Sequence, residues 1–363
     1  MFGILIREGK NKRDFKNIGD YVQSIAQKQF LKNLETCFVE IEELSDFRSE
    51  QIVNVIMNGW FTWDCSKFLP PSCINPLFVS FHLTPPKENE FFTKEITQYM
   101  KDHEPIGARD MLTMEMMKAH GIDSYFSGCL TLTLGLTYKQ NQHNGDVIFV
   151  DPYIEFGGDK SNSYLLNALK TIYWGIKHYK KAKVLQTKYK NQVLMPRLSY
   201  RVSRKLEHFL ETATFYEIYA KRFTDDVLLG AKYRTVLVDS SISNEKKFEM
   251  ADEMLKEYAV AKLVVTSRLH VAFPCLALET KNIFIIPSIK NEEKDVKRYS
   301  GRLKGLEDTV TIMELNNGEL KNTQDELPLY ITPENAPENK SGYLKYKELL
   351  INKVETFIKN TRL

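Results

Sequence analysis

The chain has 363 residues, of which 43% are hydrophobic and 12% aromatic, so it can bury a core of ordinary size. At roughly 100–200 residues per domain, this length predicts two domains or one large one. Fifty Lys and Arg residues against 47 Asp and Glu residues give a net charge of +3. A nucleic-acid-binding protein is expected to have a larger, clustered basic excess. We therefore expect no nucleic-acid partner.

The cysteines and the N-terminus exclude further classes of protein. The five cysteines lack CxxC spacing and have no His at ligand spacing; they are residues 37, 65, 73, 129 and 275. We therefore expect reduced, mostly buried thiols and neither a disulfide framework nor a metal site. The apolar start is too short for a signal peptide, and no apolar run of ~18 residues predicts a membrane span. We expect a cytoplasmic protein.

Short apolar runs alternate with segments of helical period along the first third of the chain. The expected strands are Phe2–Ile6, Cys37–Ile41, Ile52–Met57, Leu77–Phe81 and Ser124–Phe126. The expected helices are Tyr21–Leu31 and Met111–His120, the second closed by Gly121. This alternation is typical of a parallel sheet covered by helices on both faces.

The alternation stops at the polar segment 143–146 and then begins again. Further strands are expected at Val147–Val150, Lys183–Gln186, Thr235–Val238, Leu263–Val265 and Ile283–Ile286. Helices are expected at Ser161–Lys180 and at Phe248–Tyr258. We therefore divide the chain near residue 144 into two α/β domains, residues 1–143 and 144–318. Residues 319–363 are expected to form a polar connector and an amphipathic terminal helix, which could return to the first domain.

Ligands of open α/β folds bind at the carboxyl ends of the strands, so the turns from strand to helix are the candidate site. The first turn contains Asn17, Gly19 and Asp20. Asn17 or Asp20 there is typical of a helix N-cap, Gly19 would ease a tight entry, and the same N–H groups can bind an anion or ligand hydroxyls. The basic residues nearby are interpreted as a solvated loop, with a lid over an anion as the alternative; they are Arg7, Lys10, Lys12, Arg13 and Lys16.

The second turn places Arg109 and Asp110 directly before a helix. Asp110 suits an N-cap, whereas Arg109 is a cation at the positive end of the helix dipole, which is unfavourable. Either an anionic ligand or an ion pair with Asp110 would offset this. We favour contact of Arg109 with a ligand.

The third turn, residues 266–270, follows a buried strand and gives the strongest signal. Ser267 can cap the following helix, and Arg268 offers a forked donor for a carboxylate or a phosphate. His270 titrates near neutrality and can transfer a proton. A lone His on a helix is more often structural, but here it shares a turn with an Arg and a Ser.

Four other features are weaker. Trp60 could stack on a sugar or fill the rim of the core, and His82 ends a strand at the expected cleft. Cys129 is expected to be a small buried residue and not a nucleophile. A cluster of lysines is typical of a solvated helix face, with contact to an anionic membrane surface as the alternative; it comprises Lys177, Lys180, Lys181, Lys183, Lys188 and Lys190.

Four segments, in this order, resemble the polysaccharide pyruvyl transferase family. They are residues 17–20 (NIGD), Arg109-Asp110, residues 127–133 (SGCLTLT) and residues 266–270 (TSRLH). The resemblance implies two Rossmann-like domains that face each other across a cleft, as in GT-B glycosyltransferases. It also implies transfer of pyruvate from phosphoenolpyruvate to two hydroxyls of a sugar, with a cyclic ketal and phosphate as products. The sugar would belong to a polysaccharide or to a lipid-linked oligosaccharide at the inner face of the membrane.

The resemblance implies roles for individual residues. Arg109, Arg268 and Ser267 would bind phosphoenolpyruvate on the side of the second domain, and His270, assisted by Arg268, would be the general acid. The acceptor candidates on the side of the first domain are Asn17, Asp20, Trp60 and His82. Phosphoenolpyruvate is a co-substrate, and no cofactor or metal is expected. Two alternatives stay open: a GT-B glycosyltransferase that uses a nucleotide sugar, and a non-catalytic carbohydrate-binding protein of the same fold.

Overall fold

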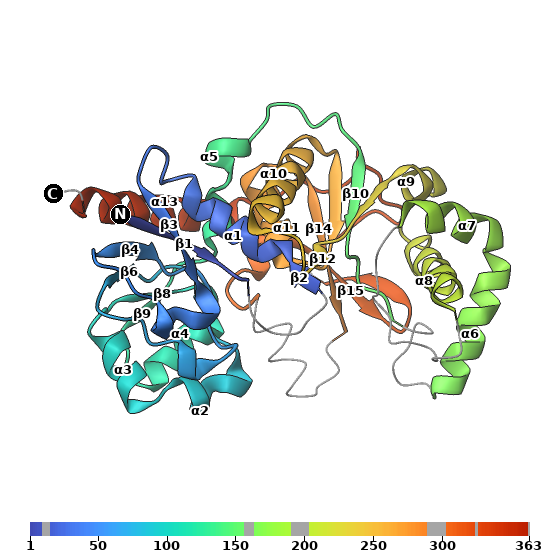
Figure 1. Cartoon of the computed structure of the whole chain (residues 1–363). Coiled ribbons are helices and arrows are strands. Elements are labelled where there is room, and N and C mark those ends of the chain that lie inside the picture. Colours follow the sequence, from blue (N-terminus) through green and yellow to red (C-terminus); the bar gives the residue numbers. More distant parts are fainter. Residues whose placement is uncertain (9–14, 156–162, 190–202, 289–302, 324–325, 362–363) are drawn as a thin grey trace.

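The structure is a computed structural model that describes residues 1–8, 15–155, 163–189, 203–288, 303–323 and 326–361. It is an α/β protein of Rossmann-like type, with helices against largely parallel sheets (Figure 1). We call the part that contains the strands from residue 2 to residue 126 the first half. The second half contains the strands of the six-stranded sheet, residues 147–322.

Apart from residues 15–17, the described strands of the first half form a parallel sheet that is broken into two pieces. One piece has the order β3-β1-β4-β6, with β1 (Phe2–Ile6), β3 (Thr36–Glu40), β4 (Val53–Ile56) and β6 (Ile74–Leu77). The other has the order β5-β7-β8-β9, with β5 (Gly59–Trp60), β7 (Phe81–His82), β8 (Ile106–Ala108) and β9 (Ser124–Phe126). The chain passes from β4 to β5 and from β6 to β7, so the second piece continues the first.

The expected strand Leu77–Phe81 is therefore wrong as a single strand. Leu77 ends β6 and Phe81 begins β7. Between them, Ser80 has a φ of 56°, which lies in the left-handed region and is incompatible with an extended strand. Gly59, with a φ of 155°, begins β5 at the equivalent break.

The second half is a six-stranded sheet within the described ranges, with the order β11-β10-β13-β14-β15-β16. Its strands are β10 (Val147–Val150), β11 (Lys232–Arg234), β13 (Leu263–Thr266), β14 (Asn282–Pro287), β15 (Thr311–Asn316) and β16 (Glu319–Asn322). All pairs are parallel except β15 with β16. The expected strand Thr235–Val238 overlaps β12 (Leu237–Asp239), which instead pairs antiparallel with β2 (Phe15–Asn17) outside this sheet.

Both halves use the same strand order. The second strand of each sheet lies on one side of the first strand, and the third strand lies on the other. The chain therefore runs to one side of the first strand and then crosses to its other side. The switch points lie between β1 and β4 in the first half and between β10 and β13 in the second. Ligands of such folds bind at these two switch points, outside the carboxyl ends of the strands.

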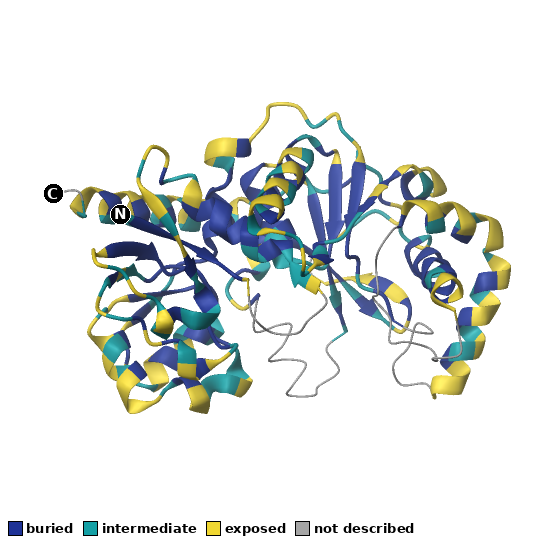
Figure 2. Cartoon of the chain, viewed as in Figure 1, coloured by how far each residue is buried: buried dark blue, intermediate teal, exposed yellow. Residues whose placement is uncertain are grey.

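Helices of both halves share one hydrophobic core. Here α1 (Ile18–Lys28) packs against α10 (Asn244–Val260) and α11 (Leu269–Ala277), and Tyr21, Leu255 and Val271 are buried in the same cluster. The remaining helices of the first half are α2 (Glu88–Phe91), α3 (Lys94–Lys101), α4 (Met111–Ala119) and α5 (Gly135–Tyr138). The buried residues form the interior between helices and sheets (Figure 2).

The terminal helix α13 (Leu344–Asn360) lies against the first half. Its buried residues Leu350, Val354 and Ile358 belong to the same core as Phe2. The ring of Tyr346 lies 4.7 Å from that of Phe126. The sequence predicted this helix, and the packing shows what its apolar face contacts.

One expected strand of the second half is wrong. Residues 183–186 lie inside α7 (Tyr179–Lys188), which follows α6 (Tyr164–Lys177) and packs on α8 (Arg204–Tyr219). Ala182 and Leu185, three residues apart, are the buried face of α7, so its apolar period is helical. The short helix α9 (Asp225–Gly230) completes this end of the molecule (Figure 1). No described helix is both long and apolar enough to cross a membrane.

Replacing Leu350 by Ala should lower the free energy of unfolding by about 2–5 kcal/mol, because it leaves a cavity in the shared core. The matched control is Leu344→Ala on the exposed start of the same helix, which should change it by less than about 0.5 kcal/mol. Urea unfolding of both variants measures the difference. Equal small effects would mean that α13 does not pack in solution as it does here.

Candidate active site

A cavity of about 470 Å³ lies where the carboxyl ends of the two sheets meet. This volume is typical of small-molecule sites. Residues of both halves line it, and they include every site residue that the sequence suggested: Asn17, Asp20, Trp60, His82, Arg109, Ser267, Arg268 and His270. Residues up to about 250 positions apart in the chain thus meet at one place, at the two switch points of the fold.

The turn after β13 is held by hydrogen bonds that differ from the expected cap. The N-cap position of α11 is occupied by Arg268, whose side chain does not cap the helix, so the prediction that Ser267 caps it is wrong. The Ser267 hydroxyl instead accepts the backbone N–H of Tyr153 at 2.8 Å. The Arg268 N–H donates to the Thr266 hydroxyl at 3.0 Å. Ser267 therefore ties this turn to the loop that follows β10.

Arg268 is positioned by a buried carboxylate. Its Nε donates to Oδ2 of Asp151 at 3.0 Å, and the same oxygen accepts the N–H of Val236 at 3.1 Å. The Asp151 side chain is completely buried, whereas that of Arg268 is about one-third exposed and lines the cavity. One of the five guanidinium N–H groups thus positions the Arg268 side chain. The described residues accept no hydrogen bond from the other guanidinium N–H groups. The remaining four N–H donors are suited to an anion in the cavity.

His270 lies in the first turn of α11, where its φ of −79° and ψ of 16° depart from the helix. The first turn of α1 packs directly against it. A Cβ placed on Gly19 would lie 3.2 Å from Cβ and 3.3 Å from Nδ1 of His270, and 3.0 Å from Oδ1 of Asn17. The absence of a side chain at Gly19 thus permits this close approach. The turn itself does not require a glycine there, because Gly19 lies within α1 and is not among the glycines with a positive φ.

Asn17 is the N-cap of α1, as expected, because its Oδ1 accepts the N–H of Gly19 at 2.9 Å. Asp20 is not the cap. Its carboxylate lies 3.4 Å from Nε of Arg7. Both residues also line the cavity, so the cap and a ligand contact are compatible at this helix end.

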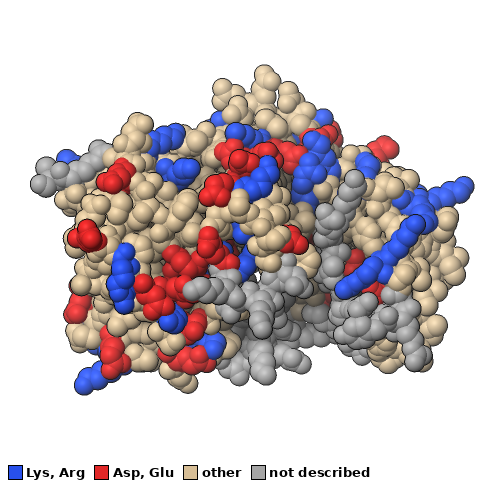
Figure 3. All heavy atoms as spheres, in the orientation of Figure 1, with Lys and Arg blue, Asp and Glu red and all other residues tan. Residues whose placement is uncertain are grey.

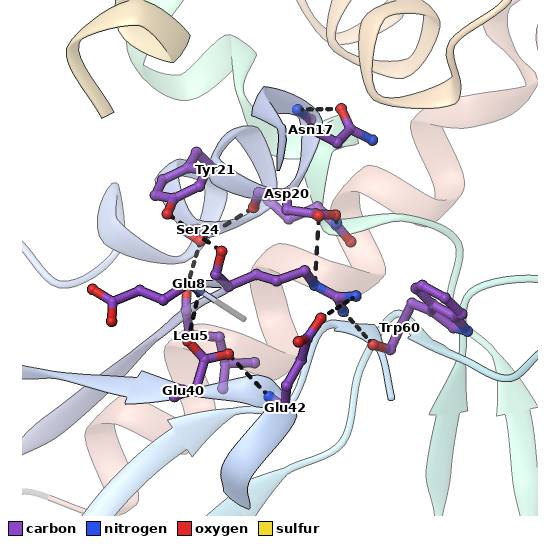
Figure 4. Close-up of polar contacts among 12 residues, drawn as sticks. Leu5, Glu8, Asn17, Asp20, Tyr21, Ser24, Glu40, Glu42 and Trp60 are labelled. Carbon is purple, nitrogen blue, oxygen red and sulfur yellow. Dashed lines mark hydrogen bonds and ion pairs between the residues drawn. The ribbon is translucent and has the colours of Figure 1, made fainter. Parts of the chain in front are cut away.

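Arg7 is the main residue that the sequence interpretation misjudged. It is 9% exposed and lines the cavity, so it does not belong to a solvated loop. The acidic groups of Asp20 and Glu42 and the carbonyl of Trp60 surround its guanidinium. These three partners are labelled in Figure 4. The Glu42 contact measures 3.3 Å and the Trp60 contact 2.5 Å, and Cζ of Arg7 lies 5.1 Å from the Trp60 ring centroid. Of its basic neighbours, Lys16 lines the cavity, whereas Lys10, Lys12 and Arg13 lie outside the described residues.

His82 and Asp110 form a buried pair at the end of β7. Oδ1 of Asp110 accepts the N–H of Thr113 at 2.9 Å, which makes it the expected N-cap of α4. Its Oδ2 lies 2.7 Å from Nδ1 of His82 and 3.7 Å from Nε of Arg109. Burial alone would raise the pKa of Asp110, but His82 and Arg109 outweigh burial and lower the pKa of this carboxyl. Asp110 is therefore ionised and can only accept a hydrogen bond, so Nδ1 of His82 is the donor and the carboxylate fixes the orientation of the ring.

The ion pair of Arg109 with Asp110 was one of the two explanations that the sequence offered for a cation at this helix end. The structure forms that pair and also places Arg109 on the cavity wall, where it is only 4% exposed.

Cys129 is a buried residue beside Thr131, with 3.1 Å between Sγ and Oγ1. Burial raises the pKa of its thiol. The prediction that Cys129 is not a nucleophile agrees with this environment.

Besides Arg7, the sequence interpretation missed Asp151, Glu42 and Trp63 as cavity residues. Arg7 directly follows β1 and Asp151 directly follows β10. The rule that ligands bind at carboxyl ends of strands would have found both residues. The same rule covers Glu42, which directly follows the expected strand Cys37–Ile41 and lies two residues beyond the end of β3. Trp63 lies three residues beyond β5 and has no such signal.

Among the described residues, the cavity combines the cations of Arg7, Lys16, Arg109 and Arg268 with the imidazoles of His82 and His270. Such a set can bind a small polyanion and transfer protons. Over the ranges that the structure describes, no group of three or more His, Cys, Asp or Glu residues is arranged to hold a metal ion. The arrangement is thus suited to acid–base chemistry on an anionic substrate.

The family model described as polysaccharide pyruvyl transferase matches residues 17–288. No protein with a curated description matches the chain. The matched range is well over half of the 363 residues, begins at the N-cap of α1 and ends just beyond β14. It contains all eight site residues that the sequence suggested. The chain belongs to the polysaccharide pyruvyl transferase family.

Proposed function

We propose that this protein transfers pyruvate from phosphoenolpyruvate to two hydroxyls of a sugar, forming a cyclic ketal and releasing phosphate. The sugar belongs to a polysaccharide or to a lipid-linked oligosaccharide, and the reaction takes place in the cytoplasm, at the inner face of the membrane when the acceptor is lipid-linked. The proposal rests on one cavity that combines arginines and imidazoles from both halves. The halves would act as two domains in a GT-B-like arrangement.

The donor is proposed to bind at the turn after β13. Phosphoenolpyruvate carries a carboxylate and a phosphate, which match the forked donors of Arg268 and Arg109. The N-terminus of α11 adds backbone N–H groups that favour an anion. Ser267 accepts from Tyr153 through one lone pair and still has its own O–H to donate to a phosphate oxygen. No cofactor is needed, because phosphoenolpyruvate is a co-substrate.

The chemistry needs proton transfer at three places. His270 as a general acid protonates the methylene carbon of phosphoenolpyruvate, so C2 becomes an oxocarbenium-like centre that a sugar hydroxyl attacks. The C2–O bond to phosphate then breaks, and the second hydroxyl closes the ketal ring. The two sugar hydroxyls together lose two protons. One balances the proton that the methylene carbon gains as it becomes a methyl group, and the departing phosphate takes up the second. His82, oriented by Asp110, is the proposed acceptor of hydroxyl protons.

The acceptor sugar is proposed to lie on the side of the first half. Trp60 and Trp63 line the cavity there, with 5.8 Å between their ring centroids, and their faces suit the apolar face of a sugar ring. Asn17 and Asp20 offer hydrogen bonds to sugar hydroxyls on the same side. Arg7 fixes the backbone of Trp60 and thus holds this wall in place.

The proposal is tested by incubating the protein with phosphoenolpyruvate and a panel of hexosides. Mass spectrometry should show the gain of a pyruvate ketal on one acceptor, together with release of phosphate. Consumption of a nucleotide sugar with no reaction of phosphoenolpyruvate would instead identify a glycosyltransferase. Sugar binding without turnover of either donor would identify a carbohydrate-binding protein.

His270→Ala should lower turnover by at least about 10², because the general acid is lost. The dissociation constant of phosphoenolpyruvate should change little, since Arg268 and Arg109 remain. Steady-state kinetics and calorimetric titration with phosphoenolpyruvate measure the two quantities. Full activity of the variant would remove His270 from the mechanism.

Arg268→Ala should weaken phosphoenolpyruvate binding by at least about tenfold, because charge-assisted hydrogen bonds are lost. Arg268→Lys keeps a positive charge beside Asp151 but loses the forked geometry, so its affinity should lie between wild type and Ala. The control is Arg48→Ala, because the exposed Arg48 donates, among the residues that the structure describes, only to the local carbonyls of residues 45 and 47. Unchanged donor affinity in Arg268→Ala, in a folded variant, would contradict the proposed donor site.

Gly19→Ala should lower turnover while the free energy of unfolding falls by no more than ~1 kcal/mol. The added methyl group meets His270 at 3.2–3.3 Å and displaces its ring. The matched control is Gly230→Ala, because a Cβ there meets no heavy atom within 4 Å. If both variants keep full turnover, the position of His270 does not depend on α1.

A further inference from the structure

The helix α6 packs on its neighbour through small and polar residues. Its buried residues are Asn167, Thr171 and Gly175, spaced four apart on one face. A Cβ on Gly175 would lie 2.9 Å from Cδ2 of Leu210 in α8, so the two helices approach closely at this point. The inner face of α6 is thus occupied by small side chains, and its large apolar side chains must lie elsewhere.

Those large side chains point outward. At 3.6 residues per turn, six of them fall within an arc of about 120° on the outer side of the helix: Leu165, Leu166, Leu169, Ile172, Tyr173 and Ile176. All six are exposed, Ile176 to 74% and Leu165 to 69%. Figure 2 shows this helix at the outer edge of the molecule, with α8 more deeply buried beside it. We call these six residues the α6 face.

An apolar groove of about 470 Å³ lies alongside, between α6 and α8. Ile172 and Ile176 of the α6 face line it together with Phe209 and Leu206 of α8. The exposed apolar surface therefore continues from α6 onto α8 and consists of several adjoining side chains. Contiguous exposed apolar surface of this kind marks an interaction site.

The charged residues of α6 and α7 themselves are all basic. From Ser163 to Lys188 the sequence contains six Lys and no Asp or Glu. Two of these lysines pair with acids of neighbouring elements, Lys177 with Glu217 and Lys181 with Asp225. Lys170, Lys180 and Lys183 form no ion pair with the residues that the structure describes. Figure 3 shows basic side chains across this end of the molecule.

The aromatic residues fit the same pattern. Tyr164, Tyr173, Trp174 and Tyr179 all belong to α6 and the start of α7. Tyr and Trp concentrate where an apolar phase meets water, because one end of each ring is apolar and the other is polar. An apolar stripe flanked by lysines and aromatic rings, without acids, is typical of helices that lie in the plane of a membrane interface.

We propose that the α6 face docks on an anionic lipid bilayer. The six apolar side chains enter the boundary between headgroups and acyl chains, while Lys170, Lys180 and Lys183 contact lipid phosphates. The 14-residue helix is about 21 Å long, shorter than the ~30 Å hydrocarbon core, so it lies in the interface and does not cross it. A second copy of this chain is a poorer occupant, because a two-fold contact through this face would bring lysines against lysines.

The surface deepens the proposed function, because it would hold the enzyme beside a lipid-linked acceptor. Only this benefit, being held beside a lipid-linked acceptor, rests on the proposed function; binding of the α6 face to lipid does not. Its test measures lipid binding and not turnover, so failure of one proposal leaves the other to be judged separately.

The test is co-sedimentation of the full chain with vesicles of phosphatidylcholine mixed with phosphatidylglycerol, and with vesicles of phosphatidylcholine alone. We expect binding to the anionic vesicles that weakens as salt is added, and much weaker binding to the neutral ones. Absence of binding to anionic vesicles, or equal binding to both, would overturn the proposal. Dimerisation in the absence of lipid that the α6 variants abolish would also overturn it, in favour of a second copy.

The triple variant Leu165→Gln, Leu169→Gln, Ile176→Gln should lower vesicle binding by at least about tenfold. These side chains are exposed, so folding should be retained. The matched control replaces three exposed apolar residues elsewhere, as Ile52→Gln, Leu136→Gln, Leu329→Gln, and should bind as the wild type does. Equal losses in both triple variants would show that the α6 face has no special role.

The triple variant Lys170→Gln, Lys180→Gln, Lys183→Gln tests the charge separately. Each lysine near an anionic surface contributes roughly fivefold to binding, so the loss should be on the order of a hundredfold. Lys177 and Lys181 are left in place, because their removal would break ion pairs with Glu217 and Asp225. Unchanged binding of this variant to anionic vesicles would contradict the electrostatic part of the proposal.

Discussion

The buried carboxylate of Asp151 connects the groups on which the cavity depends. It accepts from Nε of Arg268 and from the N–H of Val236, and the carbonyl of Val236 accepts the N–H of Ile18 at 2.7 Å. Ile18 begins α1, and the next residue, Gly19, packs against His270. A chain of contacts therefore connects Arg268, by way of both halves of the molecule, to His270 of the same turn. Movement of α1 would disturb His270, and movement of Asp151 would disturb both Arg268 and α1.

In this arrangement, hydrogen-bond donors with fixed directions suit the cavity to an anion more than an excess of positive charge does. Asp151 and Asp110 pair with Arg268 and Arg109, and Asp20 and Glu42 pair with Arg7. Among the described residues, these acids therefore offset most of the positive charge of the cavity. What it offers is N–H donors in fixed directions, which a carboxylate or phosphate binds better than a diffuse field. Of these carboxyls, Asp110 stays ionised despite its burial, because His82 and Arg109 lower its pKa.

The sequence predicted the parts of the fold and site that follow from local rules. The strands at Phe2–Ile6, Ser124–Phe126 and Val147–Val150 have the bounds expected from their apolar runs, and Asn17 and Asp110 are the expected caps. The failures come from long-range partners. Residues 183–186 read equally well as strand or helix until Ala182 and Leu185 pack on α8. Likewise, only the approach of Glu42, Asp20 and Trp60 makes a buried residue of Arg7, which the sequence places in a basic run.

The two switch points explain why residues so far apart in the chain serve one cavity. Each half supplies an imidazole and an arginine: His82 and Arg109 from the first, His270 and Arg268 from the second. In the proposed reaction one carbon would react with two hydroxyls in turn, so donor and acceptor would have to be held together through both steps. Groups that belong to a single sheet would approach the reacting carbon from one side. Groups on two sheets, joined through α1 and Asp151, can contact it from opposite sides while their separation stays fixed.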